Sequence, residues 1–311
     1  MLAPDQIQSF NRDGYLALPE VLPKDLLARI RAEYADLLQG LIKDWGLDHV
    51  ATERFETQLI AAYEAGHDWF QPMDISLPGD RIHADTPMHF GPAVFDMVCA
   101  SQVLDIVESL LGPEIESNPI QHVRIKPPAH NLREAEARAH ITSTDWHQDR
   151  AVGHQDADDT NMVTVWLAIT DATMENGCLK VKPFAGAQDV LPHCPQRQTA
   201  IASGYINEND AVSLPVPAGG IVLLHPLVPH ASRANISGGI RWSFDLRYNV
   251  AGQPSGRSHF PSFLARSSEH PGDVLNSWQD WRALWDTARA ECAQNEHIEI
   301  HRWRSDAPAC A

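Results

Sequence analysis

The hydrophobic pattern of the N-terminal part of the chain predicts helices. Residues 4–11 fit a short opening helix. After Pro23, apolar residues recur three and four positions apart, which predicts a longer helix with Gly40 as its C-cap. A further helix is predicted over residues 101–111. We therefore expect a mainly helical N-terminal layer at residues 1–112.

The middle of the chain changes to short runs of β-branched and aromatic residues. Clusters of Gly, Pro and Asn separate these runs, as at residues 217–220 and 235–239. Short strands with such turns between them are typical of a β-sandwich or a barrel. We expect this β core at residues 118–250. The strands predicted in this core are residues 120–125, 163–169, 179–181, 221–224 and 240–248. One earlier strand is predicted at residues 15–18, in the N-terminal layer.

A last helix is predicted near the C-terminus, within a flank at residues 251–311. Trp278, Trp281 and Trp285 fall at positions i, i+3 and i+7, so their side chains form one stripe that packs onto the core. The fold class expected from these patterns is mainly β with flanking helices, in a single domain.

Composition and charge narrow the function classes. The 311 residues carry a formal net charge of −17 and no Lys/Arg-rich run, which argues against nucleic acid or an anionic membrane as a partner. No apolar run approaches the ~20 residues that span a bilayer, and the first residues lack the pattern of a signal peptide. We expect a soluble, cytoplasmic protein.

The five cysteines are scattered along the chain, and no two of them form a CxxC pair. This arrangement argues against a disulfide framework and against a structural zinc site, and it favours a reducing compartment. The cysteines are Cys99, Cys178, Cys194, Cys292 and Cys310.

The segment from Thr144 to Asp149 contains the first candidate for chemistry. In an extended strand, residues two positions apart point to the same face, so His147 and Asp149 can offer a nitrogen and an oxygen to one metal ion. A second histidine from another strand would complete a set of two histidines and one carboxylate. That set, with open positions opposite, is typical of non-haem iron(II) oxygenases.

A second copy of the same triplet follows, at His154-Gln-Asp156. It lies in a polar stretch that reads as a solvated loop. The first copy follows Trp146 and a strand-like run, so we prefer His147 and Asp149 as ligands.

Two downstream histidines, His225 and His230, are candidates for the third ligand. After His230, the turn at residues 235–239 would return the chain so that Arg241 comes near the metal face. A planar guanidinium is well suited to holding a carboxylate through two parallel hydrogen bonds. This arrangement favours His230.

Several motifs in the same order resemble one known family. The matching residues are Gln6, Phe10 and Asp13 to Tyr15, then Trp146 to Asp149, Val163 to Ala168 and Glu175 to Leu179, and finally His230, Ser232, Asn235 and Arg241. They span about residues 5–250. The chain resembles the phytanoyl-CoA dioxygenase family of Fe(II)/2-oxoglutarate oxygenases.

The resemblance implies a double-stranded β-helix (jelly-roll) core with His147, Asp149 and His230 as iron ligands, and it settles the choice against His225. It further implies that Arg241 binds the distal carboxylate of 2-oxoglutarate, helped by Ser232, and that Trp166 lines the co-substrate pocket. Without the family resemblance, other interpretations of these residues stay open. Trp166 could belong to the ordinary hydrophobic core, and Ser232 and Asn235 could merely shape a turn. One departure is Pro183-Phe-Ala-Gly186, where family members usually continue toward a Pro-Gly-Ser-His turn.

The activity expected is that of a dioxygenase that uses Fe(II), O₂ and 2-oxoglutarate and releases succinate and CO₂. Related halogenases replace the metal carboxylate with a small residue, so the presence of Asp149 favours hydroxylation. Desaturation, epoxidation and ring formation use the same oxidant and stay open. The alternatives are a cupin-like metal oxygenase or isomerase that does not use 2-oxoglutarate, and a barrel that binds metal without catalysis.

The substrate side is expected to involve a small metabolite, since no basic patch suited to CoA is visible. Strand alternation places Arg241, Ser243, Asp245 and Arg247 on one face, which makes Arg247 a candidate for pairing an anionic substrate group. The alternative is a structural Asp245–Arg247 pair. Three segments are long enough to serve as lids, namely residues 69–74, 83–90 and 131–143.

Overall fold

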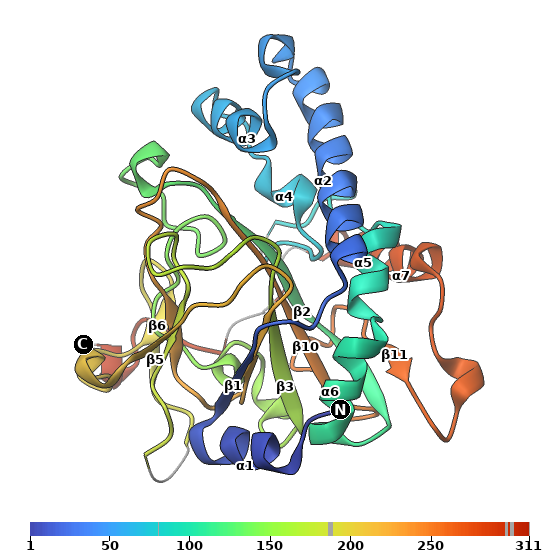
Figure 1. The fold of residues 1–311 in the computed structure, drawn as a ribbon, viewed down its shortest axis with the longest axis vertical. Coiled ribbons are helices and arrows are strands. Elements are labelled where there is room, and N and C mark those ends of the chain that lie inside the picture. Colours follow the sequence, from blue (N-terminus) through green and yellow to red (C-terminus); the bar gives the residue numbers. More distant parts are fainter. Residues whose placement is uncertain (80, 186–188, 296–297, 299–301, 311) are drawn as a thin grey trace.

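The computed structural model describes residues 1–79, 81–185, 189–295, 298 and 302–310, and it combines helices with antiparallel strands (Figure 1). The helices are α1 (Pro4–Asp13), α2 (Lys24–Asp44), α3 (Phe55–Glu64), α4 (Phe70–Met73), α5 (Pro92–Val98), α6 (Ser101–Leu111) and α7 (Trp278–Cys292). The strands are β1 (Tyr15–Leu18), β2 (Ile115–Lys126), β3 (Met162–Ala168), β4 (Leu179–Val181), β5 (His193–Pro195), β6 (Thr199–Ile201), β7 (Val212–Leu214), β8 (Ile221–Leu224), β9 (His230–Ser232), β10 (Arg241–Val250) and β11 (Phe263–Arg266).

Two antiparallel sheets form the centre of the molecule. The larger has six strands in the order β1-β8-β3-β10-β2-β11, and the smaller has three in the order β7-β4-β9. The edge strand β1 comes from the N-terminal layer and pairs with β8, while β11 comes from the C-terminal flank and pairs with β2. The larger sheet therefore joins all three regions expected from the sequence.

The two faces of the larger sheet have different neighbours. On β3, Val163, Val165 and Leu167 belong to the apolar core shared with the helices, whereas Trp166 and Ala168 belong to a cluster shared with the smaller sheet. Side chains alternate between the faces of a strand, which explains the division. Figure 1 shows α5 and α6 on one side of these strands and β5 and β6 on the other. Inward-pointing side chains of both sheets therefore meet between them.

The expected helices are present, with one correction. α6 covers the expected residues, and α7 buries two of the three tryptophans of its stripe. The C-cap expected at Gly40 is wrong, because α2 continues to Asp44. Its apolar stripe continues to Ile42, which is fully buried, and Gly40 faces open space. None of the helices in the described ranges is long and apolar enough to cross a membrane.

The cysteine pattern argues against a disulfide framework, but Cys194 and Cys310 form a disulfide. Cys194 lies in β5, and Cys310 follows 116 positions later, near the end of the chain. The two meet because the C-terminal tail returns to β5, where Trp303 stacks on His193. Their spacing in the sequence could not show this approach, and the pairing removes the cysteine argument for a reducing compartment.

Replacing Cys310 by serine is expected to lower the free energy of unfolding by about 2–4 kcal/mol, because the disulfide closes a long loop of the unfolded chain. Denaturant unfolding of the variant and the parent protein in the absence of reductant measures the effect. Added reductant should remove the difference between the two proteins. Equal unfolding midpoints under oxidising conditions would contradict a closed disulfide.

Candidate active site

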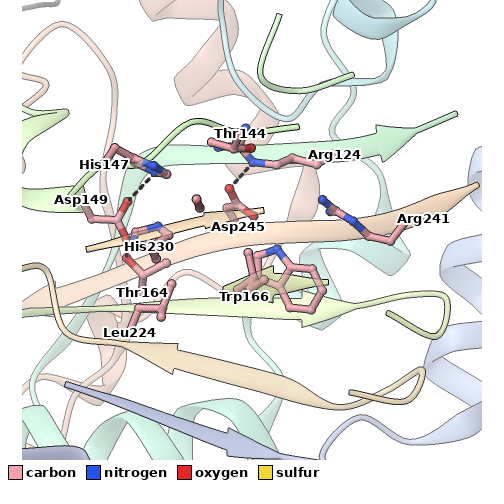
Figure 2. A pocket seen from close by; sticks show the side chains of 12 residues that line it. Arg124, Thr144, His147, Asp149, Thr164, Trp166, Leu224, His230, Arg241 and Asp245 are labelled. Atoms are coloured by element: carbon pink, nitrogen blue, oxygen red, sulfur yellow. Dashed lines mark hydrogen bonds and ion pairs between the residues drawn. The ribbon is translucent and has the colours of Figure 1, made fainter. Parts of the chain in front are cut away.

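Residues from two distant stretches of the chain meet between the sheets (Figure 2). His230 begins β9, and His147 lies opposite it in an isolated β-bridge, in which each backbone N–H donates to the other's carbonyl oxygen at 2.9 Å. Gln148 is extended, and Asp149 then opens a short 3-10 turn, Asp149–Ala151. The regular strand expected here is therefore not formed. The extended residue in between is sufficient to direct His147 and Asp149 to the same side.

The three side chains form a compact group of possible metal ligands. One ligand atom from each of His147, Asp149 and His230 lies within 4.8 Å of the other two, and all three residues are buried. Nε2 of His147 is 3.9 Å from Oδ1 of Asp149, and Nε2 of His230 is 3.8 Å from Oδ2. A single ion placed between these atoms would be within reach of all three.

Backbone carbonyl groups orient both imidazole rings. Nδ1 of His147 donates to the carbonyl oxygen of Asp145 at 2.9 Å, and Nδ1 of His230 donates to that of Val228 at 3.1 Å. In a neutral imidazole, a proton on Nδ1 leaves Nε2 with a free lone pair. Both Nε2 atoms therefore present that lone pair to the space beside Asp149.

Burial and neighbouring charges shift the pKa values of His147 and Asp149. Burial lowers the pKa of His147 well below its ordinary value, and the nearby His230 lowers it further. Burial alone would raise the pKa of Asp149, but Arg247 and the two histidines hold it well below its usual range. A neutral imidazole and an ionised carboxylate are the forms that bind a metal.

Arg247 and Thr164 hold the carboxylate of Asp149. The Arg247 guanidinium pairs with Oδ1, and the Thr164 hydroxyl donates to Oδ2 at 2.6 Å. Arg247 also donates to the carbonyl oxygen of Ile120 at 2.9 Å. The alternative Asp245–Arg247 pair is wrong, because Asp245 pairs with Arg124. A direct contact of Arg247 with substrate stays a prediction, and the structure adds a positioning role toward the metal carboxylate.

Replacing Arg247 by leucine is expected to weaken metal binding about 10- to 100-fold, because Asp149 loses the partner that keeps it ionised and oriented. It should also destabilise the metal-free protein, since one charge of a buried pair is left alone. Anaerobic titration with iron(II) measures the first effect, and thermal unfolding measures the second.

Arg247→Lys serves as the control for this change, because it keeps the positive charge but loses the fork of hydrogen bonds. We expect it to retain part of the metal affinity. Unchanged iron(II) affinity in the leucine variant would show that Thr164 alone positions the carboxylate.

The C-terminal tail and β5 support the same loop from outside. Nε2 of His193 accepts a hydrogen bond from the backbone N–H of Gln148 at 3.1 Å, between the two ligands His147 and Asp149. The indole N–H of Trp303 donates to the carbonyl oxygen of Ala151 at 2.8 Å. The tail that the disulfide ties to β5 therefore also braces the turn that carries Asp149.

Arg241 lies at the far end of the pocket from the triad, with Asp245 between them (Figure 2). Its side chain is fully buried, and Nη1 donates to the hydroxyl of Ser243 at 2.7 Å. Its Nε and Nη2 have no hydrogen-bond partner among the described residues. The guanidinium lies 5.4 Å from the ring centre of Trp166, which forms part of the pocket wall. Burial lowers the pKa of Arg241 to about 9, so it keeps its charge at neutral pH.

Ser232 has different contacts from those expected. Its hydroxyl accepts hydrogen bonds from Nζ of Lys126 at 2.7 Å and from the backbone N–H of Thr144 at 2.9 Å. Ser243, and not Ser232, contacts Arg241. Burial, and then the positive charge of Arg241, hold the pKa of Lys126 well below its ordinary range. A role of Ser232 toward 2-oxoglutarate stays a prediction.

Sequence reasoning missed Lys126 and Arg124, which lie on the inward face of β2. Lys126 is the register partner of Arg241, and Arg124 that of Ser243. A usable signal was present, because the two cations alternate with the apolar Val123 and Ile125, with Arg124 inside the predicted strand 120–125 and Lys126 directly after it. Cations at alternate positions of a buried strand must face a polar interior or a ligand.

The pocket is narrow in this conformation. Its volume is about 10 Å³, which is room for roughly one water molecule. Binding of a five-carbon acid between Arg241 and the triad would therefore require long side chains such as Arg124 to move.

The other histidine candidates lie away from this group. His225 packs its ring against Phe184, with ring centres 5.1 Å apart, and burial lowers its pKa to about 4. Neither His154 nor Asp156 belongs to the metal-ligand group found among the described residues. Of the departing segment Pro183-Phe-Ala-Gly186, Gly186 lies outside the described residues.

A second, larger cavity of about 540 Å³ reaches the same centre, and we call it the large cavity. It shares Arg124, Thr144 and His147 with the pocket of Arg241. Its volume falls in the range of small-molecule sites. Two of the segments expected as lids, residues 69–74 and 131–143, contribute to its lining. Their movement as lids stays a prediction.

Comparison with known proteins identifies the family. The profile of the phytanoyl-CoA dioxygenase (PhyH) family matches residues 10–243. The chain belongs to this family. A probable phytanoyl-CoA dioxygenase of Caenorhabditis elegans is 24% identical over 259 residues, which cover 80% of this chain and 75% of that protein.

Solved structures similar to this PhyH protein include two non-haem enzymes. The non-haem monooxygenase ThoJ has a TM-score of 0.59 at 22% identity, with 93% of this chain and 98% of that chain covered. The non-haem alpha-ketoglutarate-dependent epimerase SnoN from nogalamycin biosynthesis has a TM-score of 0.51 at 19% identity, with 81% and 85% covered. At these identities the likeness concerns the fold.

Family membership and the triad agree on the metal. Two imidazoles and one carboxylate are the donor set of non-haem iron(II) oxygenases, and they leave coordination positions for co-substrates. In this PhyH protein the buried group of His147, Asp149 and His230 fits that donor set, and the lowered pKa values of His147 and Asp149 favour the forms that bind iron(II). The protein is therefore placed among the non-haem iron oxygenases.

Proposed function

We propose that this PhyH protein is an Fe(II)- and 2-oxoglutarate-dependent dioxygenase that hydroxylates a C–H bond of a small metabolite. The balanced reaction converts R–H, O₂ and 2-oxoglutarate into R–OH, succinate and CO₂. Iron(II), when bound, supplies the activation of O₂ that this reaction requires. His147, Asp149 and His230 would hold the metal.

The buried guanidinium of Arg241 is the observation that carries the proposal. A positive charge that is fully buried and lacks two hydrogen-bond acceptors is costly unless a ligand supplies them. A carboxylate of 2-oxoglutarate is planar, negative and able to accept two parallel bonds. A cupin-like enzyme that does not use a keto acid, or a barrel that only stores metal, has no need of such a group in the pocket of its metal.

The other pocket residues would orient the co-substrate and exclude water. Ser243 fixes one edge of Arg241, and Trp166 lies against the guanidinium. Lys126 adds a donor on the neighbouring strand. These contacts leave the Nε and Nη2 edge of Arg241 free for a carboxylate, so that the keto acid end can point toward the triad.

Consumption of 2-oxoglutarate tests the proposal directly. Purified protein with iron(II), O₂ and 2-oxoglutarate is expected to release succinate, slowly without substrate and faster when a screened metabolite fits the large cavity. Under nitrogen, iron(II) and 2-oxoglutarate together should give a weak visible charge-transfer band. Iron-loaded protein that shows neither succinate nor the band would overturn the assignment.

We also propose that the two facing sheets form a double-stranded β-helix, or jelly roll, and that the chain is a single domain. The antiparallel order of both sheets and the position of the site between them support this reading. The contribution of β1 and β11 to the larger sheet supports one domain, because neither flank could be separated without removing an edge strand.

A further inference from the structure

Arg257 lies in the wall of the large cavity, and no acid in the described part of the chain pairs with it. It is 6% exposed, and Nη2 donates to the carbonyl oxygen of Val152 at 2.9 Å. Its Nη1 has no hydrogen-bond partner among the described residues. Sequence reasoning did not single out this residue, which follows β10 in an irregular segment.

The backbone holds Arg257 in a fixed position. Gly256 and Gly153 bring two segments into close backbone contact, since a Cβ added to Gly153 would lie 3.3 Å from the Cα of Gly256. The carbonyl oxygen of Gly256 accepts from the N–H of His154 at 3.0 Å, and that of Arg257 accepts from the N–H of Phe260 at 3.0 Å. The guanidinium therefore projects from a well-anchored loop.

Most of the other arginines that line the large cavity have a carboxylate partner, and Arg257 differs from them in having none among the described residues. Three of these arginines have carboxylate partners: Arg124 pairs with Asp245, Arg138 with Glu136 and Asp68, and Arg247 with Asp149. No ion pair with a described acid forms at Arg257, and the charge that acts on it is the like charge of Arg247. A buried charge without a partner is energetically costly, so we expect an anion from outside the chain to pair with Arg257.

The rest of the large cavity combines apolar walls with access to the metal site. Phe70, Ile120 and Phe260 are among its lining residues, and it extends to His147. A ligand that filled it could place an apolar body along these side chains while one end reached Arg257. Because the cavity extends to His147, a ligand that filled it would also come close to the triad.

We propose that the large cavity binds a substrate with an apolar body and one carboxylate or phosphate group, and that Arg257 binds this oxyanion. An oxyanion would supply the acceptor that Nη1 lacks and would offset the repulsion from Arg247. The inference rests on the proposed function only in calling the ligand the substrate. The chain has a net charge of −17, so an unpaired buried cation contrasts with the negative charge that prevails in the protein.

Matched probe pairs test this assignment. Phenylacetate is compared with phenylacetamide, and phenyl phosphate with phenol, by calorimetric titration into protein that holds iron(II) and 2-oxoglutarate under nitrogen. We expect at least one anion to bind about tenfold or more tightly than its uncharged partner, since charge-assisted hydrogen bonds are the stronger class. Which anion is preferred distinguishes a carboxylate from a phosphate.

Three variants then locate the effect. Arg257→Gln should remove the preference for the anion, and Arg257→Lys should keep part of it. Arg29→Gln makes the same change of net charge at an exposed position of α2 and should leave the preference intact. If both probes of each pair bind wild-type protein equally, if none binds, or if Arg257→Gln keeps the preference, the proposal is wrong.

The test of Arg257 and the test of the proposed function can fail independently. If succinate release fails but the anion preference depends on Arg257, the site stands and the 2-oxoglutarate assignment falls. If succinate release succeeds and no probe distinguishes charge, the assignment of Arg257 falls alone. The wild-type comparison decides even if the glutamine variant does not fold.

Discussion

Replacing His230 by alanine is expected to abolish turnover of 2-oxoglutarate and to weaken iron(II) binding. The loss of affinity should exceed the ~10- to 100-fold loss that is typical when a residue supporting a metal ligand is removed. The variant loses one of three ligand atoms that lie within 4.8 Å of one another. It also loses the ring that fixes one side of the metal position. Anaerobic iron(II) titration and succinate release measure the two losses.

His225→Ala is the matched control, because it removes another histidine five positions earlier on the same stretch of chain. His225 packs against Phe184 and Phe10 and takes no part in the triad. We expect a modest loss of stability with iron(II) affinity kept. If the His225 variant lost the metal and the His230 variant kept it, the ligand assignment would be wrong.

Replacing Arg241 by alanine is expected to weaken 2-oxoglutarate binding on the order of 100-fold while leaving iron(II) affinity close to that of the parent protein. Two hydrogen bonds to a charged group, each worth about 1.5–3 kcal/mol, correspond together to a loss of about 100-fold or more, so this estimate is the lower end of the range. Arg241 lies at the opposite end of the pocket from His147 and His230, so the metal ligands keep their contacts (Figure 2). The concentration dependence of succinate release on 2-oxoglutarate, beside an iron(II) titration, gives both quantities.

Two further variants control the Arg241 result. Arg241→Lys keeps the charge but not the planar fork, and it should fall between alanine and the parent protein. Ser243→Ala removes the hydroxyl that contacts Nη1 and should have a smaller effect, about tenfold or less. If turnover is unaltered in Arg241→Ala, Arg241 does not bind the co-substrate. Lys126 would then be the next candidate for that contact.

Together these variants distinguish two kinds of cation around one centre. Arg247 and Arg124 already have carboxylate partners within the chain, at Asp149 and Asp245. Arg241 and Arg257 have none among the described residues, and they lie in the pocket and in the large cavity. The first two therefore have partners inside the chain, and ligand binding by the second two is what we propose. The co-substrate and the substrate would then approach the metal from different cavities.

Much of the fold followed from the chain's local patterns. The strands β4 and β8 and the helix α6 have the predicted bounds, because each is a short apolar or amphipathic run that clear turn residues delimit. The end of α2 was misplaced because a glycine at an exposed helical position is tolerated when the apolar stripe continues past it. The disulfide was missed because its two cysteines are far apart in sequence.

The sequence by itself predicted His147, Asp149 and His230 as a metal group and Arg241 as its neighbour, from two-residue spacing, a downstream histidine, a returning strand and the family resemblance, and the structure brings the three predicted ligands together. Only the tertiary structure decided which charges are already paired. Arg247 pairs with Asp149, Ser232 accepts a hydrogen bond from Lys126, and Arg257 has no acidic partner among the residues that the structure describes. The physical reason is that the partner of a buried charge is chosen by three-dimensional proximity, which no spacing along one strand can specify.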